Sequence, residues 1–119
     1  MINETFRDIY KRLKQIPDTY DEGMSIQVYD EVAPPGTFAP YLVISGVTSS
    51  DGRLLNNSES HIKFSIHIWS DKYSKSEVYK LKENIYDVLE PKYDFIDFQC
   101  YRDIESKWYH GIMSFEIYV

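Results

Sequence analysis

The fold is decided by residues 60–90, which read SHIKFSIHIWSDKYSKSEVYKLKENIYDVLE. Large apolar residues alternate with polar ones in the first half, the period of a strand with one buried face. In the second half they recur three or four positions apart, the period of a helix with one apolar stripe. The strand residues are Ile62, Phe64, Ile66 and Ile68, and the helix residues are Val78, Leu81, Ile85 and Val88. We therefore predict a long strand, a short polar turn and a helix that packs on the apolar face of the strand.

Before this stretch, the sequence predicts one helix and two strands. Residues 2–16 carry apolar side chains at helical spacing, and Pro17 ends that helix. Residues 25–31 alternate as a short strand, and the connection 32–40 holds three prolines and a glycine, which exclude regular structure. Residues 41–48 are apolar on both faces, so we expect this strand to be covered twice, by helices on one side and by something else on the other.

After the second helix, the alternation of apolar residues predicts two more strands separated by a turn. One face of the first strand carries Ile96, Phe98 and Cys100. One face of the last strand carries Met113, Phe115, Ile117 and Val119. The predicted order is helix, strand, strand, strand, helix, strand, strand. This order indicates an α+β domain, with a mostly antiparallel sheet of about five strands and two helices packed on one face.

Length and composition favour a single domain, 1–119, that contacts other proteins. The 119 residues suffice for one hydrophobic core. The formal net charge of −6 has the wrong sign for tight binding to the backbone of nucleic acids. Aromatic residues make up 16% of the chain, and the 11 tyrosines among them suit protein interfaces as well as cores.

The single cysteine and the lack of long apolar runs bear on where the chain resides. Cys100 has no partner for an intrachain disulfide, which indicates a reducing compartment. No apolar run is long enough to span a membrane, and the N-terminal sequence lacks the apolar core of a signal peptide. We therefore expect a cytosolic chain with no membrane partner.

No set of residues predicts catalysis, a bound metal or a cofactor. His61 and His67 share a strand face but lie roughly 20 Å apart, too far to bind one ion together. His110 is placed to approach one of them across the sheet, but two histidines lack the third ligand that a metal site needs. Cys100 has no flanking catalytic motif, so we expect a buried, inert thiol.

Aromatic residues gather around the second predicted helix and the ends of the long strands. They are Trp69, Tyr73, Tyr79, Tyr86, Tyr93, Trp108 and Tyr109. Two interpretations stay open at this point, namely packing within a small domain and contact between subunits. The strand at 41–48, apolar on both faces, favours the second.

The connection between the two long strands is rich in residues that form turns. Residues 49–60 read SSDGRLLNNSES. Such a composition predicts a mobile hairpin tip on the surface of the domain.

Three local sequences can be read together once the strands are placed. They are PYLVISG at 40–46, IHIWS at 66–70 and YHGIMSFEI at 109–117. In this order, with an amphipathic helix after the second, they resemble the tail completion family of long-tailed phages, also called tail terminator or tail-to-head joining proteins. The resemblance covers nearly the whole chain.

The resemblance implies a structural protein rather than an enzyme. Such a protein forms a ring, a hexamer, at the head-proximal end of the tail tube, where it stops polymerisation of the tube and joins the tail to the head. The implied partners are further copies of the chain, the tail tube protein and the head-tail connector protein. Genomic DNA would pass through the ring without specific binding. The implied location is the virion, after assembly in the host cytoplasm.

A closed ring requires that one patch of each subunit fits a different patch of its neighbour. We assign this contact to an aromatic and apolar set, namely Tyr41, Val43, Trp69, Tyr73, Trp108 and Tyr109. We assign contact with the tube or the connector to the hairpin tip, namely Ser50, Asp51, Arg53, Leu54 and Asn56.

Three alternatives remain open. A neighbouring head-tail connector component, such as a head-closure or stopper subunit, would have a similar sequence pattern. A small enzyme or a non-catalytic ligand-binding α+β module would show a concave pocket with converging polar groups. A nucleic-acid-binding domain would need a basic face. The lysines of the second helix, however, alternate with acids: Lys75, Lys80 and Lys82 with Glu77, Glu83 and Asp87.

Overall fold

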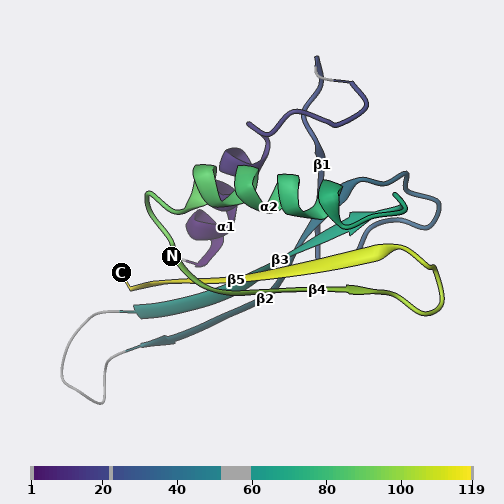
Figure 1. The fold of residues 1–119 in the computed structure, drawn as a ribbon. Coiled ribbons are helices and arrows are strands. Elements are labelled where there is room, and N and C mark those ends of the chain that lie inside the picture. Colours follow the sequence, from purple (N-terminus) through teal and green to yellow (C-terminus); the bar gives the residue numbers. More distant parts are fainter. Residues whose placement is uncertain (1, 22, 52–59, 119) are drawn as a thin grey trace.

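The computed structural model describes residues 2–21, 23–51 and 60–118. Both helices lie on the same side of one sheet (Figure 1). The elements are α1 (Ile2–Leu13), β1 (Gln27–Asp30), β2 (Tyr41–Asp51), β3 (Ser60–Ser70), α2 (Ser76–Leu89), β4 (Asp94–Arg102) and β5 (Tyr109–Tyr118). Their order confirms the predicted α+β architecture, although α1 ends at Leu13, before the predicted boundary at residue 16.

The sheet has the strand order β1-β2-β3-β5-β4. β1 runs parallel to β2, and every other neighbouring pair is antiparallel. β3 pairs with β5 from His61 to Ser70, with Phe64 opposite Phe115 and Ile66 opposite Met113. The two strands whose apolar alternation is clearest in the sequence are therefore both interior strands of the sheet.

The hydrophobic core lies between the two helices and one face of the sheet. From the helices it includes Ile9, Leu13, Val78, Leu81, Ile85 and Leu89, and from the interior strands it includes Leu42, Ile44, Phe64, Ile66, Ile68, Met113 and Phe115. Leu89 takes the last core position of α2, and Val88, predicted there, is only partly buried beside it. Each of the large side chains contributes about 1.5–3 kcal/mol by its burial.

β4 departs from the predicted alternation at Ile96. The pairing with β5 shifts register between Phe95 and Asp97, which leaves Ile96 as the extra residue of a β-bulge. Ile96 is 43% exposed as a result, while Phe95 packs against the core. The prediction that Ile96 shares a face with Phe98 and Cys100 is therefore wrong, because one extra residue reverses the alternation.

Gly111 allows α2 to approach β5 closely. A Cβ atom at this position would stand 2.7 Å from Cγ1 of Val78 in α2 and 3.2 Å from Cε1 of Phe98 in β4. Carbon atoms of a packed core do not approach so closely, so any side chain here would force the helix away from the sheet. The close packing of α2 on β5 therefore requires a glycine at position 111.

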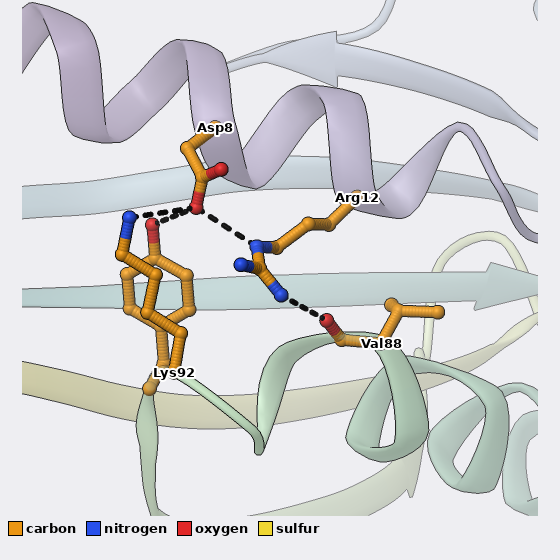
Figure 2. A network of polar contacts seen from close by, with 5 residues as sticks. Asp8, Arg12, Val88 and Lys92 are labelled. Atoms are coloured by element: carbon orange, nitrogen blue, oxygen red, sulfur yellow. Dashed lines mark hydrogen bonds and ion pairs between the residues drawn. The ribbon is translucent and has the colours of Figure 1, made fainter.

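A polar network joins α1 to the C-terminal end of α2 (Figure 2). Oδ2 of Asp8 accepts hydrogen bonds from Nε of Arg12 at 2.9 Å and from the hydroxyl of Tyr93 at 2.6 Å, and it pairs with Nζ of Lys92 at 3.4 Å. Nη1 of Arg12 also donates to the carbonyl oxygen of Val88 at 3.1 Å. Burial alone would raise the pKa of Asp8, but the bonds from Tyr93 and Arg12 outweigh it and lower that pKa.

We expect Asp8→Ala to lower the free energy of unfolding by about 1–3 kcal/mol, because it leaves the hydroxyl of the fully buried Tyr93 without an acceptor. Urea denaturation measures this loss. Adding Tyr93→Phe to the Asp8→Ala chain removes the orphaned hydroxyl and should restore part of the stability. A double variant that is less stable than Asp8→Ala would contradict this account.

Candidate functional site

The sheet face opposite the helices, which we call the helix-free face, carries a row of rings at one end. At this end, alternation along the strands places a ring from each of the five strands on this face, and these five residues form what we call the aromatic row. From β1 to β4 across the sheet they are Tyr29, Tyr41, Trp69, His110 and Tyr101. Neighbouring ring centroids are 5.8 Å apart for Tyr29 and Tyr41, 3.9 Å for Trp69 and His110, and 5.2 Å for His110 and Tyr101.

A half-open hollow of about 330 Å³ lies over the middle of the aromatic row. Its lining consists of Glu31, Val32, Ala33, Tyr41, Val43, Ser45, His67, Trp69 and His110. The connection after β1 therefore forms one wall, and β2, β3 and β5 form the floor. One carboxylate and no Lys or Arg is found among these lining residues.

His67 and His110 form a hydrogen-bonded pair in the floor of the hollow. Nδ1 of His67 lies 2.7 Å from Nε2 of His110, so one imidazole donates and the other accepts. Burial lowers the pKa of both rings, and a charge on His67 further disfavours one on His110, whose pKa falls to about 4. Glu31 beside His67 and Asp103 beside His110 oppose these shifts without reversing them. The pair is therefore uncharged at neutral pH.

Glu31 is held at the rim of the hollow by its backbone and its side chain. Its φ of 68° lies in the left-handed region, which residues other than glycine seldom adopt. Its backbone N–H donates to the carbonyl oxygen of Ile44 at 2.9 Å, and its Oε2 accepts a hydrogen bond from the hydroxyl of Ser45 at 3.3 Å. Within residues 2–21, 23–51 and 60–118, no Lys or Arg forms an ion pair with this carboxylate.

The structure brings four of the six predicted contact residues together. Tyr41, Val43 and Trp69 line the hollow, and Trp108 meets Tyr41 edge-on with ring centroids 6.4 Å apart. Tyr41 lies directly opposite Trp69 in the pairing of β2 with β3, which explains why these residues meet although they are distant in sequence. This cluster joins the aromatic row to the turn between β4 and β5.

The other two predicted contact residues lie elsewhere. Tyr109 precedes His110 in β5, so its side chain is on the opposite face of the sheet, where it packs against the core. Tyr73 is 98% exposed in the segment between β3 and α2. Neither residue lines the hollow.

The second cover expected over the strand at 41–48 comes, at least in part, from the chain itself. Val43 faces away from the helices yet is only 5% exposed, and it shares the hollow with Val32 and Ala33 of the connection after β1. Its burial therefore does not require a neighbouring subunit. Tyr41 and Trp69 remain partly exposed.

The five residues of the predicted contact loop fall into two groups, one in a strand and one outside the described residues. Ser50 and Asp51 belong to β2 and pair with β3, so their assignment to a loop is wrong, because the ladder continues past the polar residues that suggested a turn. The remaining loop residues, Arg53, Leu54 and Asn56, lie outside the described residues.

Glu31 and the histidine pair were not predicted as members of a site. His67 and His110 were considered as metal ligands and then left out of the predicted site, although their position on the same face of two long strands was a signal that they would meet. Glu31 carried no such signal, because its place depends on the path of an irregular connection.

The described residues hold no group of three or more His, Cys, Asp or Glu side chains that could bind a metal ion. The histidine pair is thus without a third ligand of these kinds. Cys100 is partly buried in β4, and this burial raises the pKa of its thiol. None of the helices in the described ranges is long and apolar enough to cross a membrane.

Comparison with known proteins gives one family and one shared fold. The family model described as Tail completion protein gp17 matches residues 7–119. The chain is also similar to a chain from the virion of a native gene transfer agent particle, with a TM-score of 0.74 and 16% identity over 93% of this chain and 90% of that chain. At this identity the likeness is one of fold. No curated protein sequence matches the chain.

Proposed function

The chain belongs to the tail completion protein gp17 family, and from this premise we propose that it forms a ring on the head-proximal end of a phage tail tube. In this role the ring ends polymerisation of the tube and presents a docking surface to the head-tail connector. The resemblance described above suggests six copies. Tail completion in the family description supports a position on the tail rather than in a head-closure ring.

The observation that carries the proposal is the aromatic row with its hollow. Partly exposed aromatic side chains gathered on one surface are typical of protein contacts, because they offer rigid apolar area with polar edges. The molecule measures 50 × 32 × 25 Å, and the row occupies one end of the helix-free face. A closed ring requires that this patch contact a different patch on the neighbouring subunit, and most of the surface lies outside the row.

The charge of the chain is compatible with DNA passing through the ring. A net charge of −6 repels phosphates, so DNA would not adhere to the inner surface by charge attraction. We therefore expect no measurable binding to duplex DNA at physiological salt, tested by a gel shift against random-sequence DNA.

The mass of the purified protein in solution tests the ring directly. We expect light scattering to report the mass of a ring, either for the protein alone or after tail tube subunits are added. A protein that stays monomeric in both conditions would overturn the proposal. It would favour a ligand-binding module, with the hollow as its pocket.

We expect the double variant Tyr41→Ala and Trp69→Ala to lose ring formation, since buried aromatic anchors at the centre of an interface each contribute about 2 kcal/mol or more. Tyr118→Ala is the matched control, because Tyr118 is a tyrosine 59% exposed near the C-terminal end of β5, away from the aromatic row. Circular dichroism of each variant checks that the monomer folds. A ring of normal stability in the double variant would exclude the aromatic row from the contact.

A further inference from the structure

We propose that the hollow on the helix-free face binds the guanidinium group of an arginine presented by a neighbouring protein subunit. This inference rests on the proposed function, since an assembled tail supplies that neighbour. It adds to the contact a particular ligand chemistry, which follows from the shape, the charge and the hydrogen-bonding groups of the hollow.

The floor of the hollow offers aromatic surface in a fixed orientation. Trp69 stacks on His110 with ring planes 11° apart, and Tyr41 is held edge-on between Tyr29 and Trp108. Rings held by such contacts lose little freedom when a ligand binds. A flat cation stacks on an aromatic face because the ring quadrupole attracts it.

The charge of the hollow points to a cation. Glu31 is the one acid in the lining, and no described basic residue pairs with it. The uncharged histidine pair leaves this carboxylate uncompensated at neutral pH. An incoming positive group would therefore gain a charge partner without displacing one that is already present.

Hydrogen bonds hold Glu31 in a left-handed backbone conformation that residues other than glycine disfavour. Its left-handed backbone is stabilised by the hydrogen bond to Ile44, and its carboxylate is oriented by Ser45. Strained residues that the surrounding structure holds in place occur often at binding sites. Here the backbone places the exposed carboxylate of Glu31 at the rim of the hollow, within hydrogen-bond distance of the Ser45 hydroxyl.

The size of the hollow favours the end of a side chain over a larger ligand. About 330 Å³ with an open mouth is at the lower limit for small-molecule pockets. A guanidinium can stack on Trp69 or Tyr41 and donate two parallel hydrogen bonds to Glu31, and it is more weakly hydrated than an ammonium group. Arginine therefore fits this surface better than lysine does.

The test is a titration of the purified chain with N-acetyl-arginine amide, followed by the NMR signals of the tryptophan indole N–H groups. We expect saturable shifts of the Trp69 signal with a Kd on the order of 1–10 mM, because a cation–π contact and one exposed ion pair are each weak. N-acetyl-citrulline amide, which has nearly the same shape without the charge, should bind at least tenfold more weakly.

Two variants make the titration specific to the hollow. Glu31→Gln should weaken binding of the arginine probe about fivefold or more, since it removes the charge and keeps the backbone N–H that bonds Ile44. Asp30→Asn is the matched control, because Asp30 is the adjacent exposed acid and does not line the hollow. Equal binding of citrulline and arginine, or unchanged binding by Glu31→Gln, would overturn the inference.

The titration tests arginine binding and the light-scattering measurement tests ring formation, so either proposal can fail while the other holds. The titration uses the chain without tube protein, at a concentration at which light scattering reports a monomer, so its outcome does not depend on ring formation. Glu31→Gln examined in the ring assay then identifies the source of the arginine. Reduced assembly supports a neighbouring subunit, and normal assembly by a variant that no longer binds the probe contradicts that source while leaving the ring itself in place.

Discussion

Acidification is expected to remove about 3 kcal/mol of the free energy of unfolding through protonation of His110, whose pKa is lowered by burial and by a charge on His67. The pKa of His110 is about 4 in the folded chain against 6.5 for the free side chain, so the unfolded chain binds the proton more tightly. The stability is fully present above pH 6.5 and is lost as the pH falls towards 4. The lowered pKa of His67 adds to this loss, while Glu31 and Asp103, which face the two rings, moderate it.

Urea denaturation at a series of pH values across this window measures the loss. His110→Gln removes the titrating ring and should flatten the dependence on pH between 6.5 and about 4. His61→Gln changes a histidine of the same face that pairs with Glu116 and leaves the histidine pair intact, so it should retain the loss. If His110→Gln and the unchanged protein lost equal stability on acidification, the histidine pair would not be its cause.

Gly111→Ala should lower the free energy of unfolding by about 1–3 kcal/mol, because the core around it has no space for a methyl group. That methyl group would stand 2.7 Å from Cγ1 of Val78, whose branched side chain is stiff and cannot turn away without moving α2. Thermal or urea denaturation measures the loss. Gly23→Ala is the control, since its Cβ would meet only the side chain of Asp21 at 3.3 Å, and we expect a change within about 0.5 kcal/mol.

A second variant separates crowding from other effects of Gly111→Ala. Val78→Ala alone should cost about 1–2 kcal/mol through the cavity it leaves. In the chain that carries both changes, the new methyl group occupies part of that cavity, so the combined loss should fall short of the sum by about 1 kcal/mol. Additive losses would show that Gly111 and Val78 do not compete for the same space.

Most of the fold could be predicted because the apolar residues of its central strand and helix recur at a regular spacing within each segment. β3 alternates without interruption from Ile62 to Ile68, and α2 keeps one apolar stripe from Val78 onward. Both patterns are local, so no knowledge of the tertiary structure was needed. The helix pattern alone does not choose between Val88 and Leu89 as the last core residue, because both follow Ile85 at a helical spacing, and packing decides.

Other errors arose where the chain is locally irregular. The bulge at Ile96 has no sequence signature in an alternating strand, and it reverses the faces of the residues before it. Ser50 resembled a turn residue, although an antiparallel ladder accepts polar residues on its exposed face. In both places, pairing with the neighbouring strand determines the local structure, and the segment's own sequence does not reveal that pairing.

The candidate site was predicted in part for a related reason. Tyr41 and Trp69, grouped in the sequence analysis, lie opposite each other, since two long antiparallel strands bring their far ends together. Tyr109 was grouped with Trp108 among the aromatic residues at the ends of the long strands, whereas alternation places Tyr109 on the core side. Glu31 depends on the course of the connection from β1 to β2, which no periodicity encodes.

The bulge in β4 also bears on how the free protein avoids aggregation. β4 is an edge of the sheet, and nine residues of edge strand would offer unpaired backbone groups to a strand of another molecule. The extra residue at Ile96 interrupts that template, and the charged Asp94 and Asp97 flank it. The opposite edge, β1, has only four residues. The bulge and charges of β4 and the shortness of β1 make these two strands poor templates for edge-to-edge pairing between free chains.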